Sequence, residues 1–318
     1  MLIDSFNRKI DYIRVSVTSR CNFRCLYCMP NTPMDWEPRE NLLSYEELFQ
    51  FLKVAIDEGV KKVRLTGGEP LIRRDIEKFV EMLRNYAPDL EIALTTNGYY
   101  LPELAEKLKK AGLNRVNISL DSLQRERVRK IAQKEALEKI LAGIDKALEV
   151  GLGVKLNSVI MKGVNSDEVV DLLEFARGKG VTIRFIEFME NSFAYPGLKR
   201  FSSGEILAEI GKKYKFTQLE RDNSPARYFQ LEDGYKFGII EPHKEDFCKN
   251  CNRIRLTAEG YLIPCLYFDE AMEIKTAVRQ GDLERAKEIL REVVRNKPEK
   301  NRWSEGEESN RRFFETGG

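Results

Sequence analysis

The chain has 318 residues, of which 42% are apolar and 33% are charged, so it is long enough to bury a complete globular core. Its 53 basic residues nearly cancel its 51 acidic residues, and the formal charge of +2 argues against general binding to nucleic acid or to a membrane surface. The single histidine, His243, argues against a serine-hydrolase mechanism, in which histidine carries the proton. No apolar run reaches the roughly 20 residues that span a bilayer, so we expect a cytoplasmic protein.

Apolar periodicity predicts strands and helices that alternate along the first two thirds of the chain. The expected strands are 11–17, 61–65, 91–95, 114–119, 153–160 and 182–188. The expected helices are 44–58, 75–86, 102–111, 134–150 and 166–179. A full barrel of this type has eight βα units, and here the alternation stops after six. The sequence therefore predicts an α/β fold with an incomplete (βα)6 barrel.

The pattern changes after residue 213, where short strand-like runs such as 214–217 and 235–240 replace the alternation. We expect this segment to cover the open side of the barrel. A helix is expected over 283–295, followed by a polar tail over 296–312. We accordingly divide the chain into a partial barrel, 1–213, and a C-terminal region, 214–318.

All six cysteines fall into two spaced triplets. The first is a CxxxCxxC motif directly after the first expected strand, and the second is a CxxC motif followed by a third cysteine thirteen residues later. Their members are Cys21, Cys25 and Cys28, and Cys248, Cys251 and Cys265. A structural zinc site takes four protein ligands, whereas three thiolates leave one iron of a four-iron cluster open. Zinc is an alternative at both triplets, completed by His243 at the second, and a redox pair of thiols is a further alternative at the first.

Four unusual segments follow directly after expected strands. They are Cys21–Cys28, Gly67-Gly68-Glu69-Pro70, Thr95-Thr96-Asn97-Gly98 and Ser119-Leu120-Asp121-Ser122. In parallel α/β sheets the carboxyl ends of the strands carry the ligand site, so these segments predict one shared active site. Taken singly, the glycine pair is an ordinary turn, and the hydroxyl residues are ordinary helix caps.

Strand alternation also predicts a cluster of positive charge. Arg14, Arg64 and Lys155 alternate with apolar residues and are expected to face the barrel interior, where an anion would have to neutralise them. The alternative is that each is a solvated charge on the outside. Arg253 and Arg255 are two residues apart on an expected strand, so they share a face and suit a polyphosphate beside the second cysteine triplet.

The CxxxCxxC motif and the Gly67–Pro70 turn together resemble the radical S-adenosylmethionine (SAM) superfamily. The resemblance implies that Cys21, Cys25 and Cys28 hold a [4Fe-4S] cluster whose open iron binds SAM. It further implies cofactor contacts from Tyr27, Gly68, Ser119 and Met189. For Met189, an ordinary role in core packing is an equal alternative.

Over almost the whole chain, the sequence is similar to the GTP 3′,8-cyclase family of molybdenum cofactor biosynthesis. The similarity covers residues 66–75 and 117–122, the distal cysteine spacing, Arg253-Ile254-Arg255 and the terminal Gly317-Gly318. It implies a second [4Fe-4S] cluster on the distal triplet and GTP as the substrate. The implied GTP contacts are Arg14, Arg64, Thr95, Lys155, Arg253 and Arg255. The implied catalytic residues are Arg14, Arg253, Arg255, Gly317 and Gly318, the glycines by insertion into the active site.

The resemblance also implies conversion of GTP to 3′,8-cyclo-7,8-dihydro-GTP, an external one-electron reductant, a following enzyme of the pathway and a homodimer. One alternative is a peptide-modifying radical enzyme with an auxiliary cluster, which would usually need more cysteines in its C-terminal half. Another is a non-enzymatic iron–sulfur or zinc module. A module that only carries electrons or binds a partner would not require six βα units whose strand ends converge on one site.

Overall fold

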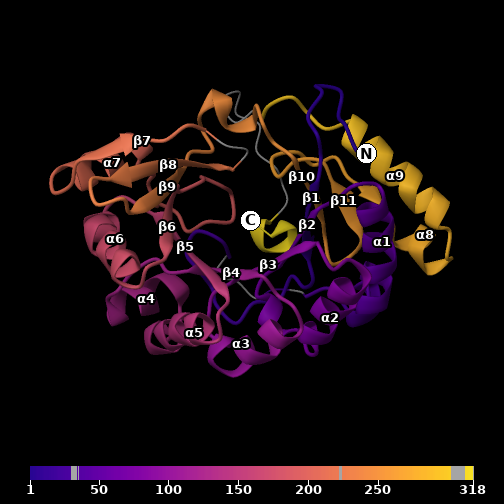
Figure 1. Cartoon of the computed structure of the whole chain (residues 1–318), viewed down its shortest axis with the longest axis horizontal. Coiled ribbons are helices and arrows are strands. Elements are labelled where there is room, and N and C mark those ends of the chain that lie inside the picture. The colour runs from indigo at the N-terminus through magenta and orange to yellow at the C-terminus, as the bar shows by residue number, and fades with distance from the viewer. Residues whose placement is uncertain (30–33, 35, 222–223, 302–311, 318) are drawn as a thin grey trace.

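The computed structural model describes residues 1–29, 34, 36–221, 224–301 and 312–317. Their strands form one curved sheet of twelve strands, and most of the helices lie on its outer side (Figure 1). In spatial order the sheet reads β12-β11-β10-β1-β2-β3-β4-β5-β6-β9-β8-β7. Among these described residues, no helix is both long and apolar enough to cross a membrane.

The bounds of the elements follow chain order. The strands are β1 (Tyr12–Ser16), β2 (Lys62–Thr66), β3 (Glu91–Thr96), β4 (Arg115–Ser119), β5 (Gly153–Ile160), β6 (Thr182–Glu187), β7 (Phe216–Gln218), β8 (Ala226–Leu231), β9 (Lys236–Ile240), β10 (Arg253–Leu256), β11 (Tyr261–Ile263) and β12 (Met272–Glu273). The α-helices are α1 (Tyr45–Asp57), α2 (Ile76–Tyr86), α3 (Leu101–Lys110), α4 (Arg125–Ala132), α5 (Leu137–Glu149), α6 (Val169–Gly178), α7 (Ser203–Gly211), α8 (Lys275–Arg279), α9 (Leu283–Arg295) and α10 (Phe313–Thr316).

The six predicted strands are confirmed as β1 to β6, and they pair in parallel in chain order. The expectation that the C-terminal region covers the open side needs correction. Strand β10 pairs in parallel with β1, and β9 pairs in parallel with β6, so this region extends the sheet at both edges. Each of these strands is followed or preceded by an antiparallel neighbour instead of a helix, which is why no βα pattern marks them in the sequence.

Helix α1 shows how the sequence specifies the outer layer. Ser44 and Glu47 form a capping box, in which the Ser44 hydroxyl accepts a hydrogen bond from the Glu47 amide and the Glu47 carboxylate accepts one from the Ser44 amide. Leu48, Phe51 and Leu52 are spaced at helical periodicity and are fully buried. They pack in a core that also contains the outward-facing side chains of the sheet.

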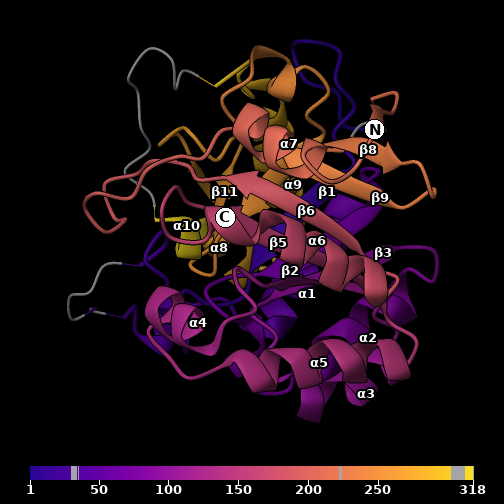
Figure 2. The same ribbon diagram turned by 90° about the vertical axis from the view of Figure 1, so that its left-hand side faces the viewer.

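Strand β1 shows why the inner face of the sheet is polar. Ile13 and Val15 are fully buried in the core between sheet and helices, so Tyr12, Arg14 and Ser16 point to the opposite face. That face is the interior of the curved sheet. The short helix α10 near the C-terminus is encircled by the sheet in Figure 1, and Figure 2 shows it toward one end of the strands.

Candidate active site

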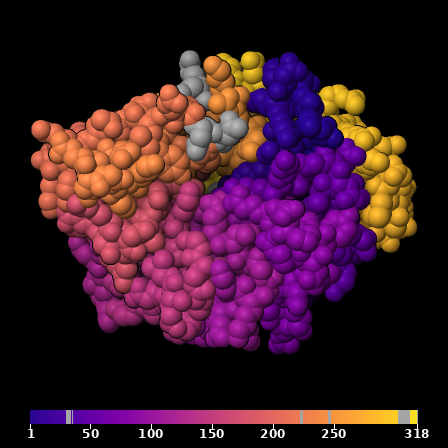
Figure 3. Space-filling model, in the orientation of Figure 1, coloured from indigo at the N-terminus to yellow at the C-terminus, as the bar shows by residue number. Residues whose placement is uncertain are grey.

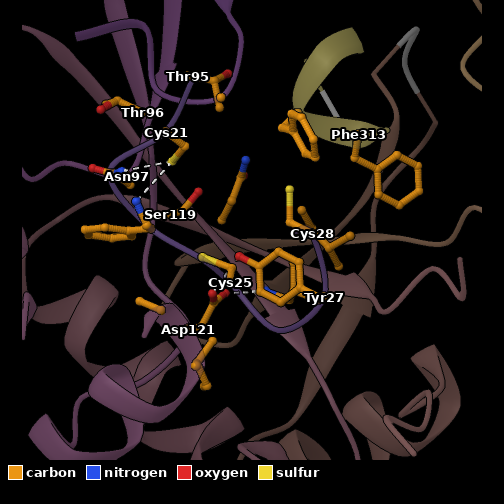
Figure 4. Close-up of a pocket in the computed structure, with 18 of the residues that line it drawn as sticks. Cys21, Cys25, Tyr27, Cys28, Thr95, Thr96, Asn97, Ser119, Asp121 and Phe313 are labelled. Carbon is orange, nitrogen blue, oxygen red and sulfur yellow. Dashed lines mark hydrogen bonds between the residues drawn. The ribbon is translucent and has the colours of Figure 1, made fainter. Parts of the chain in front are cut away.

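The loop after β1 brings the first cysteine triplet to the carboxyl edge of the sheet. Cys21, Cys25 and Cys28 are free thiols that line one cavity of about 200 Å³. Figure 4 shows them around this cavity, with Phe313 of α10 beside it. The loop turns tightly, since the amides of Cys28 and Met29 both donate hydrogen bonds to the Cys25 carbonyl, at 2.9 and 3.0 Å. We call this space the cysteine cavity.

The thiols of the cysteine cavity suit a cluster better than a single ion. Among the described residues, no three His, Cys, Asp or Glu side chains lie close enough to share one metal ion. A cluster instead takes each thiolate on a different iron, so separated thiols around one cavity fit it. Burial raises the pKa of Cys21 and Cys28 to about 12, so both need the positive charge of a metal to ionise.

The glycine pair after β2 supports the cysteine loop from behind. A Cβ atom on Gly67 would overlap the Thr18 carbonyl oxygen, and one on Gly68 would overlap the carbonyl oxygens of Ser19 and Arg20. The Gly68 amide donates to the Thr18 carbonyl at 2.8 Å. Close approach of the backbone to the loop that leads into Cys21 is therefore one reason for glycine here, besides the predicted approach to a ligand.

Glu69 links the second and third strand ends. Its side chain is completely buried and accepts hydrogen bonds from the Leu71 amide, the Thr96 hydroxyl and the Asn97 amide, at 3.0, 2.7 and 2.7 Å. Burial nevertheless raises the pKa of this carboxyl to about 7. Glu69 thus connects the loop after β2 to the loop after β3.

The remaining residues expected to contact SAM also line the cysteine cavity. Ser119 lies at the end of β4, and Met189 follows β6. The Tyr27 hydroxyl donates a 2.8 Å hydrogen bond to the Asp121 carboxylate, which also accepts from the Val159 amide at 2.8 Å. Asp121 therefore fixes the orientation of the Tyr27 ring (Figure 4).

A second and larger cavity, of about 860 Å³, fills the interior of the curved sheet. We call it the cationic cavity. Its described lining contains ten lysines and arginines but only two acidic residues, Asp11 and Glu91. Arg14 is paired in register with Arg64 on one side and with Arg255 on the other, so the three arginines lie side by side on neighbouring strands. An anion is needed to offset this concentration of like charge.

Sequence reasoning missed five cations of this lining: Lys61, Lys62, Arg115, Arg184 and Lys297. Three of them, Lys62, Arg115 and Arg184, lie on strands. The alternation that identified Arg64 would have found them, because Lys62 precedes Arg64 by two residues and Arg184 lies opposite Asn157 in the β5–β6 register. Lys62 and Arg115 share the carboxylate of Glu91, at 3.1 and 2.7 Å. This carboxylate neutralises only part of the charge.

Several buried polar atoms of the two cavities have no hydrogen-bond partner among the described residues. They include Tyr12 Oη, Arg64 Nε, Thr95 Oγ1 and Arg184 Nε. Buried donors without a partner are costly, since each has lost its hydrogen bonds to water. Their position on the cavity walls indicates that a polar ligand completes them.

The distal cysteine triplet lies at one end of the cationic cavity. Cys248, Cys251 and Cys265 are free thiols and line it together with Arg253 and Arg255. Burial opposes ionisation of Cys251, but Arg253 and Lys297 outweigh it and lower the pKa of this thiol to about 6. An Arg253 guanidinium nitrogen lies 3.5 Å from the Cys251 sulfur. The donor set again fits a cluster held by three thiolates.

The C-terminal residues reach the boundary between the cavities. Nη1 of Arg255 donates to the carbonyls of Thr316 and Gly317, at 3.0 and 3.1 Å. Gly317 adopts φ of 71°, and a Cβ atom there would overlap the Thr66 side chain, so the position requires glycine. Gly318, also predicted to act in the site, lies outside the described residues.

The predicted site residues thus line two cavities that share a wall. The cysteine cavity holds the first triplet with Tyr27, Gly68, Thr95, Ser119 and Gly317. The cationic cavity holds the second triplet with Arg14, Arg64, Lys155, Arg253 and Arg255. Asn157, Ile186 and Met189 line both cavities and form their common wall. His243 is half-buried in the turn after β9 and does not belong to either lining.

Comparison with known proteins supports one family. Residues 15–176 match the Radical SAM superfamily, and residues 181–303 match Molybdenum Cofactor Synthesis C. The chain is 69% identical over 318 residues to a GTP 3′,8-cyclase of Nautilia profundicola and 60% identical over 323 residues to one of Aliarcobacter butzleri, each match covering 100% of both chains.

Solved structures show the same fold at much lower identity. The crystal structure of Streptococcus suis SuiB bound to S-adenosylmethionine has a TM-score of 0.64 and 15% sequence identity, over 85% of this chain and 64% of that one. This chain therefore spans somewhat less than two thirds of SuiB, and the likeness concerns the fold alone. On the full-length relatives and the matched family models, the chain belongs to the GTP 3′,8-cyclase family of the radical SAM superfamily.

Proposed function

We propose that this chain is a GTP 3′,8-cyclase that converts GTP to 3′,8-cyclo-7,8-dihydro-GTP in molybdenum cofactor biosynthesis. The observation that carries the proposal is the common wall between a cavity lined by the CxxxCxxC thiols and a cavity lined by ten cations. A nucleoside triphosphate suits the second cavity because its phosphates offset charge that the described acidic residues leave unbalanced. The names of the full-length relatives point to the same substrate.

We assign the triphosphate and the nucleoside to different parts of the site. Arg14, Arg64 and Lys155 supply positive charge on the inner face of the sheet, and Arg253 and Arg255 do so beside the distal thiols. The Thr95 hydroxyl, which has no hydrogen-bond partner among the described residues, lines the cysteine cavity and is assigned to a sugar hydroxyl of the substrate. This arrangement directs the ribose toward the cysteine cavity.

The cysteine cavity is assigned to the first [4Fe-4S] cluster and SAM. Cys21, Cys25 and Cys28 would hold the cluster, and the chemistry supplied there would be reductive cleavage of SAM to a radical able to remove the 3′ hydrogen of GTP. Tyr27 is held by Asp121 to pack against the adenine, and Met189 flanks it from the common wall. The protein residues thus orient two ligands and exclude water between them.

The distal triplet is assigned to a second [4Fe-4S] cluster. Three buried or half-buried thiols line the cavity that we assign to GTP, so these residues would hold the cluster beside the purine and leave one iron without a protein ligand. Arg253 and Arg255 lie on β10 directly after Cys251 and are therefore able to position the nucleotide beside it. Gly317, held by Arg255, would complete the active site from the other side.

The proposed reaction sets requirements outside the chain. It needs an external one-electron reductant, and its product passes to the next enzyme of the pathway. Six free thiols that serve as cluster ligands also need a reducing compartment, which supports a cytoplasmic location.

The proposal is tested by anaerobic incubation of the reconstituted enzyme with SAM, a chemical reductant and GTP, ATP, CTP or UTP in turn. We expect 5′-deoxyadenosine together with a cyclised nucleotide from GTP alone. The double variant Arg253→Ala/Arg255→Ala should bind GTP more weakly but still cleave SAM without product. Formation of 5′-deoxyadenosine with every nucleotide left unchanged would refute the assignment of GTP and favour a peptide substrate.

A further inference from the structure

A short segment after α9, residues 297–301, contacts the surroundings of the distal cysteine triplet at several points. We call it the strap. We propose that Lys297 and Asn301 of the strap are positioning residues that hold the second iron–sulfur cluster and raise its reduction potential. This inference rests on the second cluster of the proposed function. It concerns residues that the sequence analysis treated only as part of a polar tail.

Lys297 is the first anchor of the strap. Its side chain is buried, with 3% of the residue exposed, and its ammonium group donates a 2.7 Å hydrogen bond to the carbonyl of Pro264, the residue before Cys265. It lines the cationic cavity with all three distal thiols. A buried ammonium group needs a negative partner, and in the described part of the chain it has a carbonyl but no carboxylate. The distal thiolates and their cluster supply that charge.

Asn301 is the second anchor. Its amide nitrogen lies 3.2 Å from the Pro242 carbonyl and 3.5 Å from the sulfur of Cys248, to which it donates a hydrogen bond. Hydrogen bonds to cluster sulfurs stabilise the extra negative charge of the reduced state and raise the reduction potential. Lys297 and Asn301 therefore act on the cluster in the same direction from opposite ends of the strap.

The beginning of the chain fixes the strap in place. The guanidinium group of Arg8 donates to the carbonyls of Cys248, Pro298 and Glu299, at 3.0, 2.6 and 2.7 Å. Asp4 in turn holds Arg8 at 2.6 Å. Figure 3 shows the N-terminal residues (indigo) beside the C-terminal helices (yellow). One side chain thus joins the loop of Cys248 to the strap and so positions Lys297 and Asn301 beside the distal thiols.

The charge of Lys297 has a defined electrochemical consequence. Reduction adds one electron, delivered by the external reductant of the proposed function, and increases the negative charge of the cluster by one. A nearby cation favours that state, so loss of the cation makes reduction harder. Arg253 and Arg255 are assigned to GTP, whereas Lys297 is directed at the loop before Cys265 and remains a partner of the cluster when substrate is bound.

The test is a redox titration of the full-length holoprotein followed by electron paramagnetic resonance, with the second-cluster signal identified in the C21A/C25A/C28A background. Lys297→Gln retains a donor for the Pro264 carbonyl but removes the charge. At the wild-type midpoint, we expect its ratio of reduced to oxidised second cluster to fall about tenfold, which corresponds to ~59 mV for one electron. Asn301→Leu should shift the ratio in the same direction.

Two further variants separate charge from packing. Lys297→Arg keeps the charge and should have the wild-type midpoint potential of the second cluster. Lys300→Gln makes the same chemical change at an exposed strap residue and should leave it unchanged. A wild-type midpoint in Lys297→Gln, with both clusters bound, would overturn the inference while leaving the proposed function intact. Iron for only one cluster in the wild-type protein would overturn the proposed second cluster and this inference with it.

Discussion

Arg255 shows how a single side chain joins distant parts of this site. Its register places it beside Arg14, and its guanidinium group holds two carbonyls of the C-terminal residues at 3.0 and 3.1 Å. Burial and the neighbouring Arg253 lower the pKa of Arg255 to about 10, which still leaves it charged at neutral pH. The planar group can face the tail with one nitrogen and the cavity with the others, which the single ammonium group of lysine cannot do.

Asp121 leads to a prediction at the residue scale. Burial raises the pKa of this carboxyl to about 6 from an ordinary value near 3.8, so the folded protein keeps its proton to higher pH than the unfolded chain. The free energy of unfolding of the metal-free protein should therefore fall as pH rises from 4 to 6. We expect about 1–2 kcal/mol, less than the full shift implies because the residue is only half-buried.

Urea unfolding at a series of pH values measures this dependence. Asp121→Asn can preserve both hydrogen bonds, since the Tyr27 hydroxyl is able to accept as well as donate, and it should flatten the dependence. Asp171→Asn, at an exposed position of α6, should keep the wild-type slope. An unchanged slope in Asp121→Asn would contradict the prediction.

At the scale of elements, the C-terminal tail enters the molecule where the cavities meet. Helix α10 places Phe313, Phe314 and Gly317 on the wall of the cysteine cavity. The Phe314 side chain is buried, and its ring lies 6.2 Å from that of Trp36, measured between centroids. The tail is therefore part of the site in the described structure, although most of it reads as polar in sequence.

Gly317→Ala should reduce cyclised product at least tenfold while SAM cleavage continues. The added methyl group overlaps the Thr66 side chain and displaces the tail from Arg255. Gly281→Ala is a matched control, because Gly281 has a similar φ of 72° but nothing within 4 Å of its Cβ position. Both variants carry the same left-handed strain of about 1 kcal/mol, so only the clash distinguishes them.

The product and 5′-deoxyadenosine are measured in the same reaction, and thermal unfolding reports stability. The Gly281→Ala protein should retain wild-type product formation. Adding Thr66→Ser to Gly317→Ala removes the methyl group that causes the worst overlap and should restore part of the activity. Full activity of Gly317→Ala alone would exclude the proposed role of the tail.

At the scale of the whole molecule, the sheet combines two sites that differ in chemistry. Strands β1 to β6 place the first cysteine triplet and its neighbours at one edge, while β10 adds the second triplet beside β1. Because β10 pairs in parallel with β1, the loops that carry the two triplets lie at opposite ends of these strands. The first triplet follows β1, whereas Cys248 and Cys251 precede β10 and Cys265 follows β11, the antiparallel neighbour of β10. The cationic cavity, which we assign to the substrate, lies in the interior of the sheet.

Metal content tests this arrangement. The anaerobically reconstituted protein should hold about eight irons, four for each triplet. Replacing Cys248, Cys251 and Cys265 together by alanine should leave about four irons and preserve SAM cleavage. Iron and zinc analysis of both proteins provides the measurement. About four irons with one zinc in the wild-type protein would contradict a second cluster.

Sequence alone predicted the parts that local rules determine. The six parallel strands followed from apolar periodicity, and the convergence of strand ends followed from the rules of parallel sheets. The inward direction of Arg14 and Arg64 followed from alternation. Strand β10 brings Arg253 and Arg255 into register with β1, but that pairing joins residues more than 200 positions apart, and no local pattern encodes it.

Other contacts of the site escaped prediction for a related reason. The hydrogen bond from Tyr27 to Asp121 spans 94 positions, and that from Lys297 to the Pro264 carbonyl depends on how α9 packs. Side chains that act through other side chains carry no motif of their own, and they become visible only in the folded molecule.

The excess of positive charge in the cationic cavity has a consequence for the response of the empty protein to salt. Dissolved ions weaken exposed ion pairs and so usually lower the stability that those pairs provide. Here ten cations line one cavity with two carboxylates, so they repel one another, and anions that enter the cavity reduce this repulsion. The nucleotide then acts as a counterion that binds only the folded state. The free energy of unfolding is therefore highest when the substrate is bound.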